Sequence, residues 1–286
     1  MTTDVERAQG AEAAISEVTP AQSYEEFFGP AIFDPLATVT LRHAAPRPGE
    51  RVLDLACGTG IVTRRVAAAV GPDGRVLGLD VNPAMLAEAA SRPRPPGAPV
   101  EWRQGDAVRA DLSGEEFDLV VCQQGLQFFT DRSAGVRLMR RCLAPGGRAV
   151  VAVWRGLEVH PLYRALADAE LPHLVSLGAD VTLADLEAPF SLGDADELRR
   201  LVEEAGFEHV TLAETTIEAR FPTPERFVER MEYAYAAVIP AFAADASAFA
   251  DYLGRITRAT RDIVAEHVRG NHVVVPMHTR LVVARA

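Results

Sequence analysis

The sequence predicts an α/β fold, in which a mostly parallel sheet carries helices on both faces. Short apolar segments alternate with helical patterns between residues 51 and 154. The first of these segments runs into Asp54 and then into a turn containing Gly58 and Gly60. The chain has 286 residues, 48% of them hydrophobic, which is enough for one large domain with insertions or for two smaller domains.

The elements of the first half follow from these patterns. Residues 1–20 read as a frayed or weakly helical leader, and Tyr24–Arg42 as one or two short helices that stop before Pro46. Asn82 is expected to cap a helix that has Pro83 at its first position. We expect strands at Arg51–Leu55, Arg75–Leu79, Val100–Gln104, Phe117–Cys122 and Arg148–Trp154, and further helices at Ile61–Val70 and Ser133–Leu143.

The second half adds helices to the sheet. Asp194 and Glu197 resemble a capping box, and the helix that follows ends at Gly206. Strands are expected at Val210–Ile217 and Met277–Arg285. Two stretches, Arg155–Leu192 and Phe221–His272, exceed a basic sheet and could form a lid over the carboxyl ends of the strands or pack on the sheet edge. The apolar positions at helical spacing in the second stretch are Phe227, Met231, Tyr235 and Val238, then Phe249, Leu253, Ile256, Ile263 and Val264.

Composition excludes several functions. The formal charge is −11 and every basic residue apart from histidine is an arginine, which opposes binding to duplex nucleic acid. Cys57, Cys122 and Cys142 lack metal-like or disulfide-like spacing, so we expect reduced thiols and no metal. The N-terminus lacks the pattern of a signal peptide and no run of about 18 apolar residues occurs. The expected location is therefore the cytoplasm.

The turn after the first strand predicts a ligand site. Glycines at 58 and 60 let a ligand lie on the backbone, and the free N–H groups of the next helix point at it. Asp54 favours a cationic group there and disfavours a phosphate. A dinucleotide site is the alternative, but Thr63 stands where its third glycine belongs, and Asp80 suits either ligand. A tight turn without a ligand also remains open.

Together these segments resemble motifs I to III of the class I S-adenosylmethionine (SAM) methyltransferases, and among them the UbiE-like small-molecule group. Val52–Gly60 is similar to motif I, Gly78–Leu86 to motif II and Gln104–Ala107 to motif III. The resemblance implies a Rossmann-like, seven-stranded methyltransferase sheet, mostly parallel with an antiparallel last strand, and helical lid insertions. It divides the chain into an N-terminal helical segment (1–45), a SAM-binding core (46–154), a first lid (155–192), a core continuation (193–220), a second lid (221–272) and a last strand (273–286).

The resemblance also implies the cofactor SAM and its product S-adenosylhomocysteine (SAH). Asp80 would accept from the ribose hydroxyls, Val81 and Met85 would flank the adenine, and Asp106 would accept from its amino group, although an aspartate there is usually a turn former. Tyr24 and Phe28 would close over the methionine end or pack against the sheet. The implied cofactor-binding residues are Tyr24, Phe28, Asp54, Ala56, Cys57, Gly58, Thr59, Gly60, Asp80, Val81, Met85, Gly105, Asp106, Ala107 and Gln123.

Acceptor-side residues are expected after the fourth and fifth strands and on the second lid. The substrate candidates are Gln127, Phe128, Trp154, His160, Met231 and Tyr235, and the candidates for a catalytic role are His160, Gln124 and Gln127. A lone histidine is more often structural. No strong base is required when the acceptor is already nucleophilic.

The expected function is transfer of the SAM methyl group to a carbon, oxygen or nitrogen of a small apolar or aromatic metabolite, in quinone-type or secondary-metabolite biosynthesis. The alternatives are a SAM-binding member that does not methylate, a nucleic-acid methyltransferase and an NAD-dependent oxidoreductase. Gln123–Leu126 differs from the tetrapeptide of amino-methylating nucleic-acid enzymes, and the chain has no Pro-Cys pair. The expected partner is a small-molecule substrate, in a monomer or homodimer.

Overall fold

A computed structural model describes residues 19–94, 96–236 and 246–286 of the chain. Most of the expected leader and Val238 of the expected stripe lie outside these ranges, and so does the side chain of Tyr235. The chain forms two compact units. The sheet unit comprises Ile32–His160, Ala188–Ile217 and Pro276–Ala286, and the helical unit comprises Met1–Ala31, Pro161–Glu187 and Glu218–Val275.

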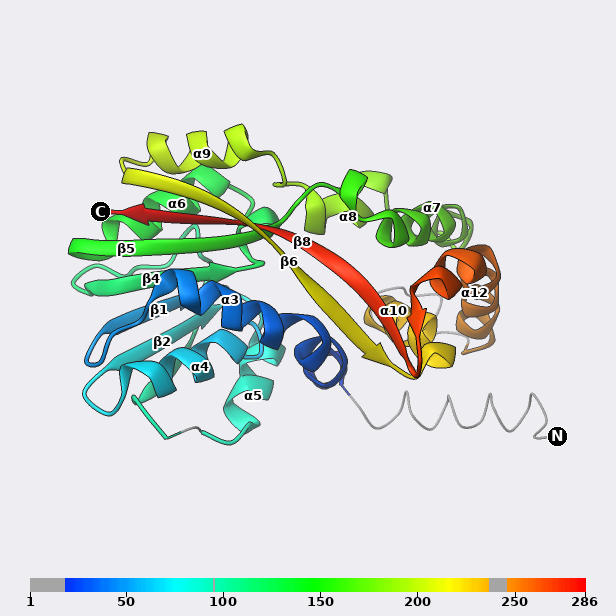
Figure 1. Cartoon of the computed structure of the whole chain (residues 1–286), viewed down its shortest axis with the longest axis horizontal. Helices are drawn as coiled ribbons and strands as arrows, with labels where there is room; N and C mark the ends of the chain where they lie inside the picture. The colour runs from blue at the N-terminus through cyan, green and yellow to red at the C-terminus, as the bar shows by residue number, and fades with distance from the viewer. Residues whose placement is uncertain (1–18, 95, 237–245) are drawn as a thin grey trace. The chain divides into compact units, whose positions relative to one another are not determined.

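One sheet organises the strands in the order β3-β2-β1-β4-β5-β8-β6, with β7 paired to β8 (Figure 1). Strands β1 to β5 pair in parallel and β8 is antiparallel to β5. The predicted mostly parallel sheet with an antiparallel last strand is therefore confirmed. The strands are β1 (Arg51–Leu55), β2 (Arg75–Asp80), β3 (Val100–Gln104), β4 (Phe117–Gln123), β5 (Leu143–Trp154), β6 (Glu208–Pro222), β7 (Val268–Arg269) and β8 (His272–Arg285).

The core of the sheet unit has two layers, because successive residues of a strand face opposite sides. Val52 contributes to the cluster beneath α3 (Asp34–Ala44) and α4 (Ile61–Val70), while its neighbour Leu53 joins the cluster beneath α6 (Arg132–Arg141) and α9 (Ala195–Glu204). Figure 1 shows these helix pairs on opposite sides of the sheet. Both faces are covered, as the near-continuous apolar strands predict.

Helix starts follow their predicted capping signals. The Asn82 side chain accepts from the Ala84 N–H at 2.9 Å at the start of α5 (Pro83–Ser91), and Asp194 accepts from the Glu197 N–H at 2.7 Å. The Glu197 side chain pairs with Arg132 at 3.1 Å, so the side chain that would complete the box is engaged elsewhere. The N-terminal helical run consists of α2 (Pro20–Ser23), a π-helix (Tyr24–Phe33) and α3.

Strands β2 and β4 are one residue longer than predicted, and three further strands exceed their predicted bounds by more. Strand β5 begins at Leu143 because Leu143 pairs with Phe117, followed by a register shift before Leu119. The Pro-Gly-Gly sequence expected to be a loop therefore lies inside a bulged strand. Strands β6 and β8, which are hydrogen-bonded neighbours, also exceed the predicted 210–217 and 277–285, and burial alternates along most of the added residues.

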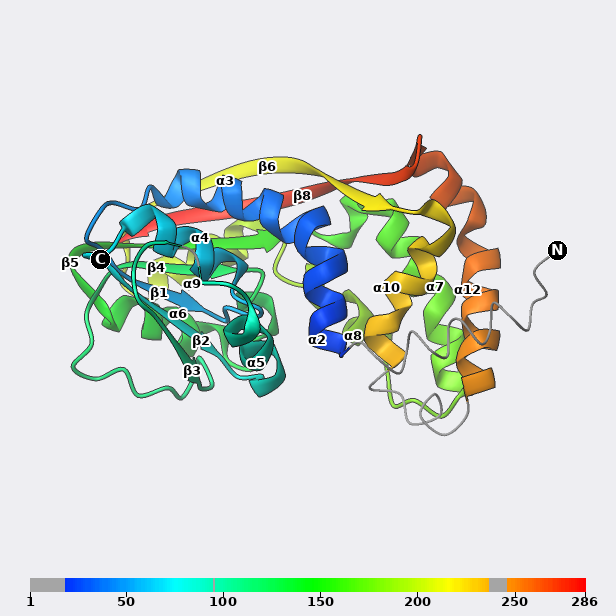
Figure 2. The same ribbon diagram turned by 90° about the horizontal axis from the view of Figure 1, so that it is seen from below.

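The helical unit contains α7 (Pro161–Ser176), α8 (Leu183–Glu187), α10 (Phe227–Ala236) and α12 (Ala246–His267) as well as α2. Helix α7 packs against α12 and α8, and α10 packs against α12 and α2 (Figure 2). Buried aromatic rings of Phe27, Phe221 and Phe227 lie in its interior. Within the described ranges, no helix combines the length and apolarity needed to cross a bilayer.

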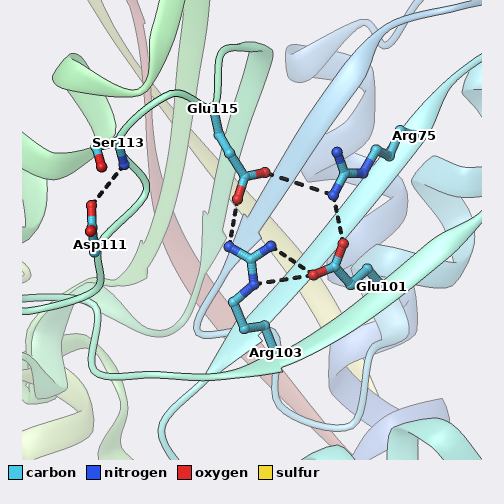
Figure 3. A network of polar contacts seen from close by, with 6 residues as sticks. All are labelled: Arg75, Glu101, Arg103, Asp111, Ser113 and Glu115. Carbon is cyan, nitrogen blue, oxygen red and sulfur yellow. Dashed lines mark hydrogen bonds and ion pairs between the residues drawn. The ribbon is translucent and has the colours of Figure 1, made fainter.

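A ring of four charged side chains protects the edge strand β3 (Figure 3). Glu101 pairs with Arg75 and Arg103, each at 2.6 Å, and Arg103 also pairs with Glu115 at 2.5 Å. Glu115 lies 3.8 Å from Arg75 and completes the ring. Charges on an edge strand oppose pairing with another chain, and this network links β2, β3 and the loop before β4.

Candidate cofactor and acceptor site

The loop after β1 folds sharply back under the end of β2. Its backbone has positive φ at Ala56 (59°), Gly58 (55°) and Gly60 (80°), and the Cys57 N–H donates to the Leu79 carbonyl at 3.1 Å. A Cβ at Gly60 would lie 2.3 Å from the Trp102 ring, so only glycine fits there. Ala56 adopts the left-handed region despite its Cβ, a conformation that strains an alanine.

Asp80 connects three loops at the carboxyl ends of the strands. Its Oδ2 accepts from the Gly58 N–H at 2.7 Å and its Oδ1 from the Asn82 N–H at 2.8 Å. The Asp80 carbonyl accepts from the Gly105 N–H at 2.9 Å. Each carboxylate oxygen can accept a second hydrogen bond. Asp80 therefore holds the glycine loop and keeps acceptor capacity for two ligand hydroxyls.

A buried acid lies under the same loop. Asp54 is 1% exposed, and the Thr63 hydroxyl donates to its Oδ2 at 2.5 Å. Burial, reinforced by the charge of Asp80, raises the pKa of Asp54 to about 7 despite the Thr63 hydrogen bond. Burial and the same two acids raise the pKa of the Cys57 thiol well above its usual range. The electrostatics of this loop favour a cation and disfavour a pyrophosphate.

The end of β3 and the start of α5 complete this side of the site. Asp106 forms a turn, in which its Oδ1 accepts from the Val108 N–H at 2.8 Å, and its side chain remains partly exposed. Val81 is 64% exposed, Met85 is half-buried and Ala107 is buried. The sequence-predicted residues of motifs I to III thus come together at one edge of the sheet.

The chemistry of these groups fits SAM. Asp80 offers acceptors for the ribose hydroxyls, and Val81 offers exposed apolar surface for a flat ring. Asp54 supplies negative charge for an ammonium and a sulfonium. Helix α4 begins at Gly60 without a side-chain cap, so its first N–H groups suit a carboxylate.

Two glutamines that follow β4 lie together with the tryptophan that ends β5. Gln124 has positive φ (56°), and its Oε1 accepts from the Trp154 N–H at 3.1 Å and from Gln127 Nε2 at 2.8 Å. Gln127 is 4% exposed, whereas its neighbour Phe128 is 57% exposed. A Cβ at Gly125 would lie 2.6 Å from the Ala56 Cβ, so this segment touches the glycine loop.

The side chain of Gln123, a predicted cofactor-binding residue, has structural partners. Gln123 Oε1 accepts from the Thr40 hydroxyl at 2.7 Å, and its Nε2 donates to the Phe33 carbonyl at 3.2 Å, so this side chain supports the N-terminal helical run. A cofactor role for Gln123 is therefore limited to its main chain, and it stays a prediction.

His160 is also held by the main chain. Its Nδ1 lies 3.0 Å from the Gly156 carbonyl, and its Nε2 accepts from the His278 N–H at 3.0 Å. These contacts select the neutral ring protonated at Nδ1. Burial lowers its pKa to about 4. This geometry argues against the catalytic candidacy of His160 and indicates a link between the end of β5 and β8.

The remaining predicted residues belong to the helical unit. Tyr24 and Phe28 have ring centroids 5.7 Å apart, and Phe28 lies 6.3 Å from Phe221 in an edge-on contact. Met231 is half-buried on α10, which also carries Tyr235. The cofactor role of Tyr24 and Phe28 and the substrate role of Met231 and Tyr235 remain predictions.

Two functional contributions escape the sequence patterns. The Trp102 ring covers Gly60 and Gly78, where a Cβ would collide with it. The Thr63 hydroxyl donates to Asp54 and offsets part of the cost of burying that carboxyl group. Both depend on contacts between separate elements. A glycine inside a strand, such as Gly78, is the one local signal for the close approach of Trp102.

Residues 52–147 match the model of a methyltransferase domain. The chain is 33% identical, over 181 residues, to the ubiquinone/menaquinone biosynthesis C-methyltransferase UbiE of Ectopseudomonas mendocina, a match that covers 60% of this chain and 70% of that relative. The chain belongs to the class I SAM-dependent methyltransferases. The comparison thereby selects SAM, among the ligands considered for the glycine loop, as the cofactor of this methyltransferase.

Solved structures share the fold of the methyltransferase at low identity. Phosphoethanolamine N-methyltransferase 2 of Haemonchus contortus, in complex with SAM, gives a TM-score of 0.53 at 17% identity, covering 93% of this chain and 56% of that one. The [4+2]-cyclase SpnF gives 0.50 at 20% identity, covering 88% and 80%. The fold alone therefore does not select the reaction.

Proposed function

We propose that this methyltransferase transfers the methyl group of SAM to a ring carbon of a small, quinone-type aromatic acceptor. The observation that carries the proposal is the 33% identity, over 181 residues, to a ubiquinone/menaquinone biosynthesis C-methyltransferase. The formal charge of −11 supports a small metabolite rather than a nucleic acid as the acceptor.

The acceptor side of the proposed site combines apolar surface with few polar groups. In the sheet unit, Phe128 is exposed beside Gln127 and the buried Trp154. Flat aromatic acceptors suit such a surface, because most of a ligand site is apolar and a few polar groups fix orientation.

The proposed reaction is an in-line displacement. The electron pair of the acceptor carbon forms the new C–C bond while the C–S bond breaks, and the pair of the C–S bond stays on sulfur as SAH forms. The ring proton is lost to solvent after the methylated product leaves the pocket. Positioning of the two substrates and exclusion of water provide the acceleration, and no protein base is required. The occupied ring of His160 agrees with that scheme.

The test uses 1,4-naphthalenediol and SAM with the purified chain, and NMR of the isolated product. We expect a ring C-methyl product and a stoichiometric amount of SAH. A product carrying only O-methyl groups would overturn the carbon specificity. Tight SAH binding with no methylated product from this or related diols and phenols would favour a non-methylating member of the fold.

A further inference from the structure

A pair of hydrogen-bonded amides lies where β4 ends. Gln124 Oε1 accepts from both the Trp154 N–H and Gln127 Nε2, and these two donors fix the orientation of the Gln124 amide. Its Nε2 therefore points away from them. The hydrogen bond from Gln127 uses its Nε2, so its Oε1 is left on the other side of that amide. The pair offers one donor group and one acceptor atom.

Both of these atoms are buried and unmatched. Among the residues that the structure describes, nothing hydrogen-bonds Gln124 Nε2 or Gln127 Oε1. Native proteins satisfy nearly all buried polar groups, so a neighbouring unmatched donor and acceptor indicate a group that binds there. Gln127 itself is 4% exposed, and its side chain is fixed rather than mobile on a surface.

The surrounding contacts hold the pair rigidly. The Gln127 carbonyl accepts from Arg132 at 3.1 Å, and Arg132 also binds the Ser191 hydroxyl at 2.6 Å and Glu197 at 3.1 Å. On the other side, Gly125 lies against Ala56 of the glycine loop. The amides are therefore fixed next to the loop, on the side of β4 and β5 rather than of β2 and β3, where Asp80 and Asp106 lie.

We propose that the Gln124–Gln127 pair is the polar anchor of the acceptor substrate. This inference rests on the proposed function and specifies it. Gln124 Nε2 donates to an oxygen on the acceptor ring, and Gln127 Oε1 accepts from a hydroxyl of the same ring. The substrate class is therefore a hydroxylated ring, such as a phenol or hydroquinone, rather than a plain hydrocarbon. Because amides neither gain nor lose a proton near neutral pH, the acceptor ionises by its own acidity.

The experiment compares 1-naphthol with naphthalene as probes for the protein saturated with SAH, with affinity measured by fluorescence titration. We expect the wild type to bind 1-naphthol at least tenfold more tightly. In Gln127→Met, which keeps the volume and loses both polar atoms, the preference should fall within twofold while the affinity for SAH stays within twofold. Arg137→Met, an exposed change on α6, serves as the control and should retain the wild-type preference.

The wild-type comparison does not depend on the folding of any variant. Equal binding of the two probes by the wild type, or an unchanged preference in a folded Gln127→Met, would overturn the proposal. So would a tenfold loss of SAH affinity in that variant, because the pair would then bind the cofactor. Absence of methyl transfer to 1,4-naphthalenediol together with a lost preference in Gln127→Met would reject the proposed reaction and still support the anchor.

Discussion

The buried acid under the glycine loop gives the most direct test of how this site selects its ligand. Asp54 has a usual pKa of 3.8 that burial raises to about 7. Above pH 7 the folded protein therefore carries a carboxylate whose ionisation disfavours folding by about 4 kcal/mol, from 1.36 kcal/mol for each of about three pH units. Asp54→Asn removes that charge and keeps an oxygen for Thr63. The amide still loses some hydration on burial, so we expect a net stabilisation of about 1–3 kcal/mol.

The direction of the Asp54 pKa shift sets the pH range over which the stability of the folded protein changes. A raised pKa in an acid means that the folded state binds the proton more tightly, so wild-type stability falls between about pH 4 and pH 7 and levels off above. The stabilisation by Asp54→Asn should appear across that window and reach its full size at pH 8. Thermal unfolding at pH 5 and pH 8 measures it, and Asp73→Asn in an exposed turn is the control, with a change within about 0.5 kcal/mol.

Ligand binding should move in the opposite direction. The carboxylate attracts the cationic groups of SAM, so Asp54→Asn should weaken SAM affinity at pH 8 by at least about tenfold, or 1.4 kcal/mol. Wild-type affinity should fall as the pH drops through about 7, and the variant should lose that dependence. A variant that is no more stable at pH 8 and binds SAM with the wild-type pH profile would refute the reasoning, because Asp54 would then contribute no charge to the site.

Four further predictions follow from other contacts. Asp80→Ala should lose about 2–4 kcal/mol of SAH affinity in a calorimetric titration, and it should also lower the unfolding temperature, because the Gly58 and Asn82 N–H groups lose their acceptor; unchanged affinity would place the ribose elsewhere. Ala56→Gly should stabilise the protein by about 1 kcal/mol in urea unfolding, since glycine relieves the positive φ. Met231→Ala should lower or redirect turnover while SAH affinity stays within about twofold, or roughly 0.4 kcal/mol. If the variant kept the turnover and selectivity of the wild type, Met231 would have only a packing role. Burial, with Glu170 nearby, raises the pKa of Glu232 well above its usual value of 4.5, so wild-type stability should fall as the pH rises above about 4.5. Glu232→Gln should reduce that fall in circular-dichroism melts at pH 5 and pH 8; parallel losses in both proteins would contradict it.

Local signals account for the parts of the fold that the sequence predicts well. Strand β1, helix α4 and strand β3 have the predicted bounds, because glycine or proline residues in turns lie beside each of them. The start of β5 is different. Pro145 and the glycines after it indicate a loop, but pairing of Leu143 with Phe117 draws the segment into the sheet. A contact between distant residues overrides the local preference there.

The residues of the site also differ in whether local sequence signals predict them. Asp80, Gly58 and Gly105 were predictable, because each lies at or just after the end of a strand and parallel strands end at one edge. The strained backbone at Gln124 and the saturated ring of His160 were not, since both depend on partners that become neighbours only in the folded sheet. Residue type alone ranks His160 as a candidate base, and only the geometry shows its nitrogens to be occupied.

Helix α10 shows why a hydrophobic period can mislead. The pattern through Phe227 and Met231 predicts an apolar stripe, but the inward positions include Phe227, Val228 and Glu232, all buried. A glutamate beside a stripe is normally read as solvated. Its burial is possible because the Tyr252 hydroxyl donates to Glu232 at 2.6 Å and because Glu170, also buried, contacts it as a second carboxyl group.

The buried acids Glu232 and Asp54 require opposite forms of compensation. Two carboxyl groups in contact cannot both ionise at low energetic cost, so Glu170 and Glu232 share a proton and stabilise the helical unit while they keep it. Asp54 has a hydroxyl partner and no such proton donor among the groups that shift its pKa, so a ligand cation is the partner that would favour its charged form. The fold itself thus compensates for the burial of Glu232, whereas a bound ligand would compensate for the charge of Asp54. That difference explains why Glu232→Gln should affect stability alone, whereas Asp54→Asn should increase stability at the expense of binding.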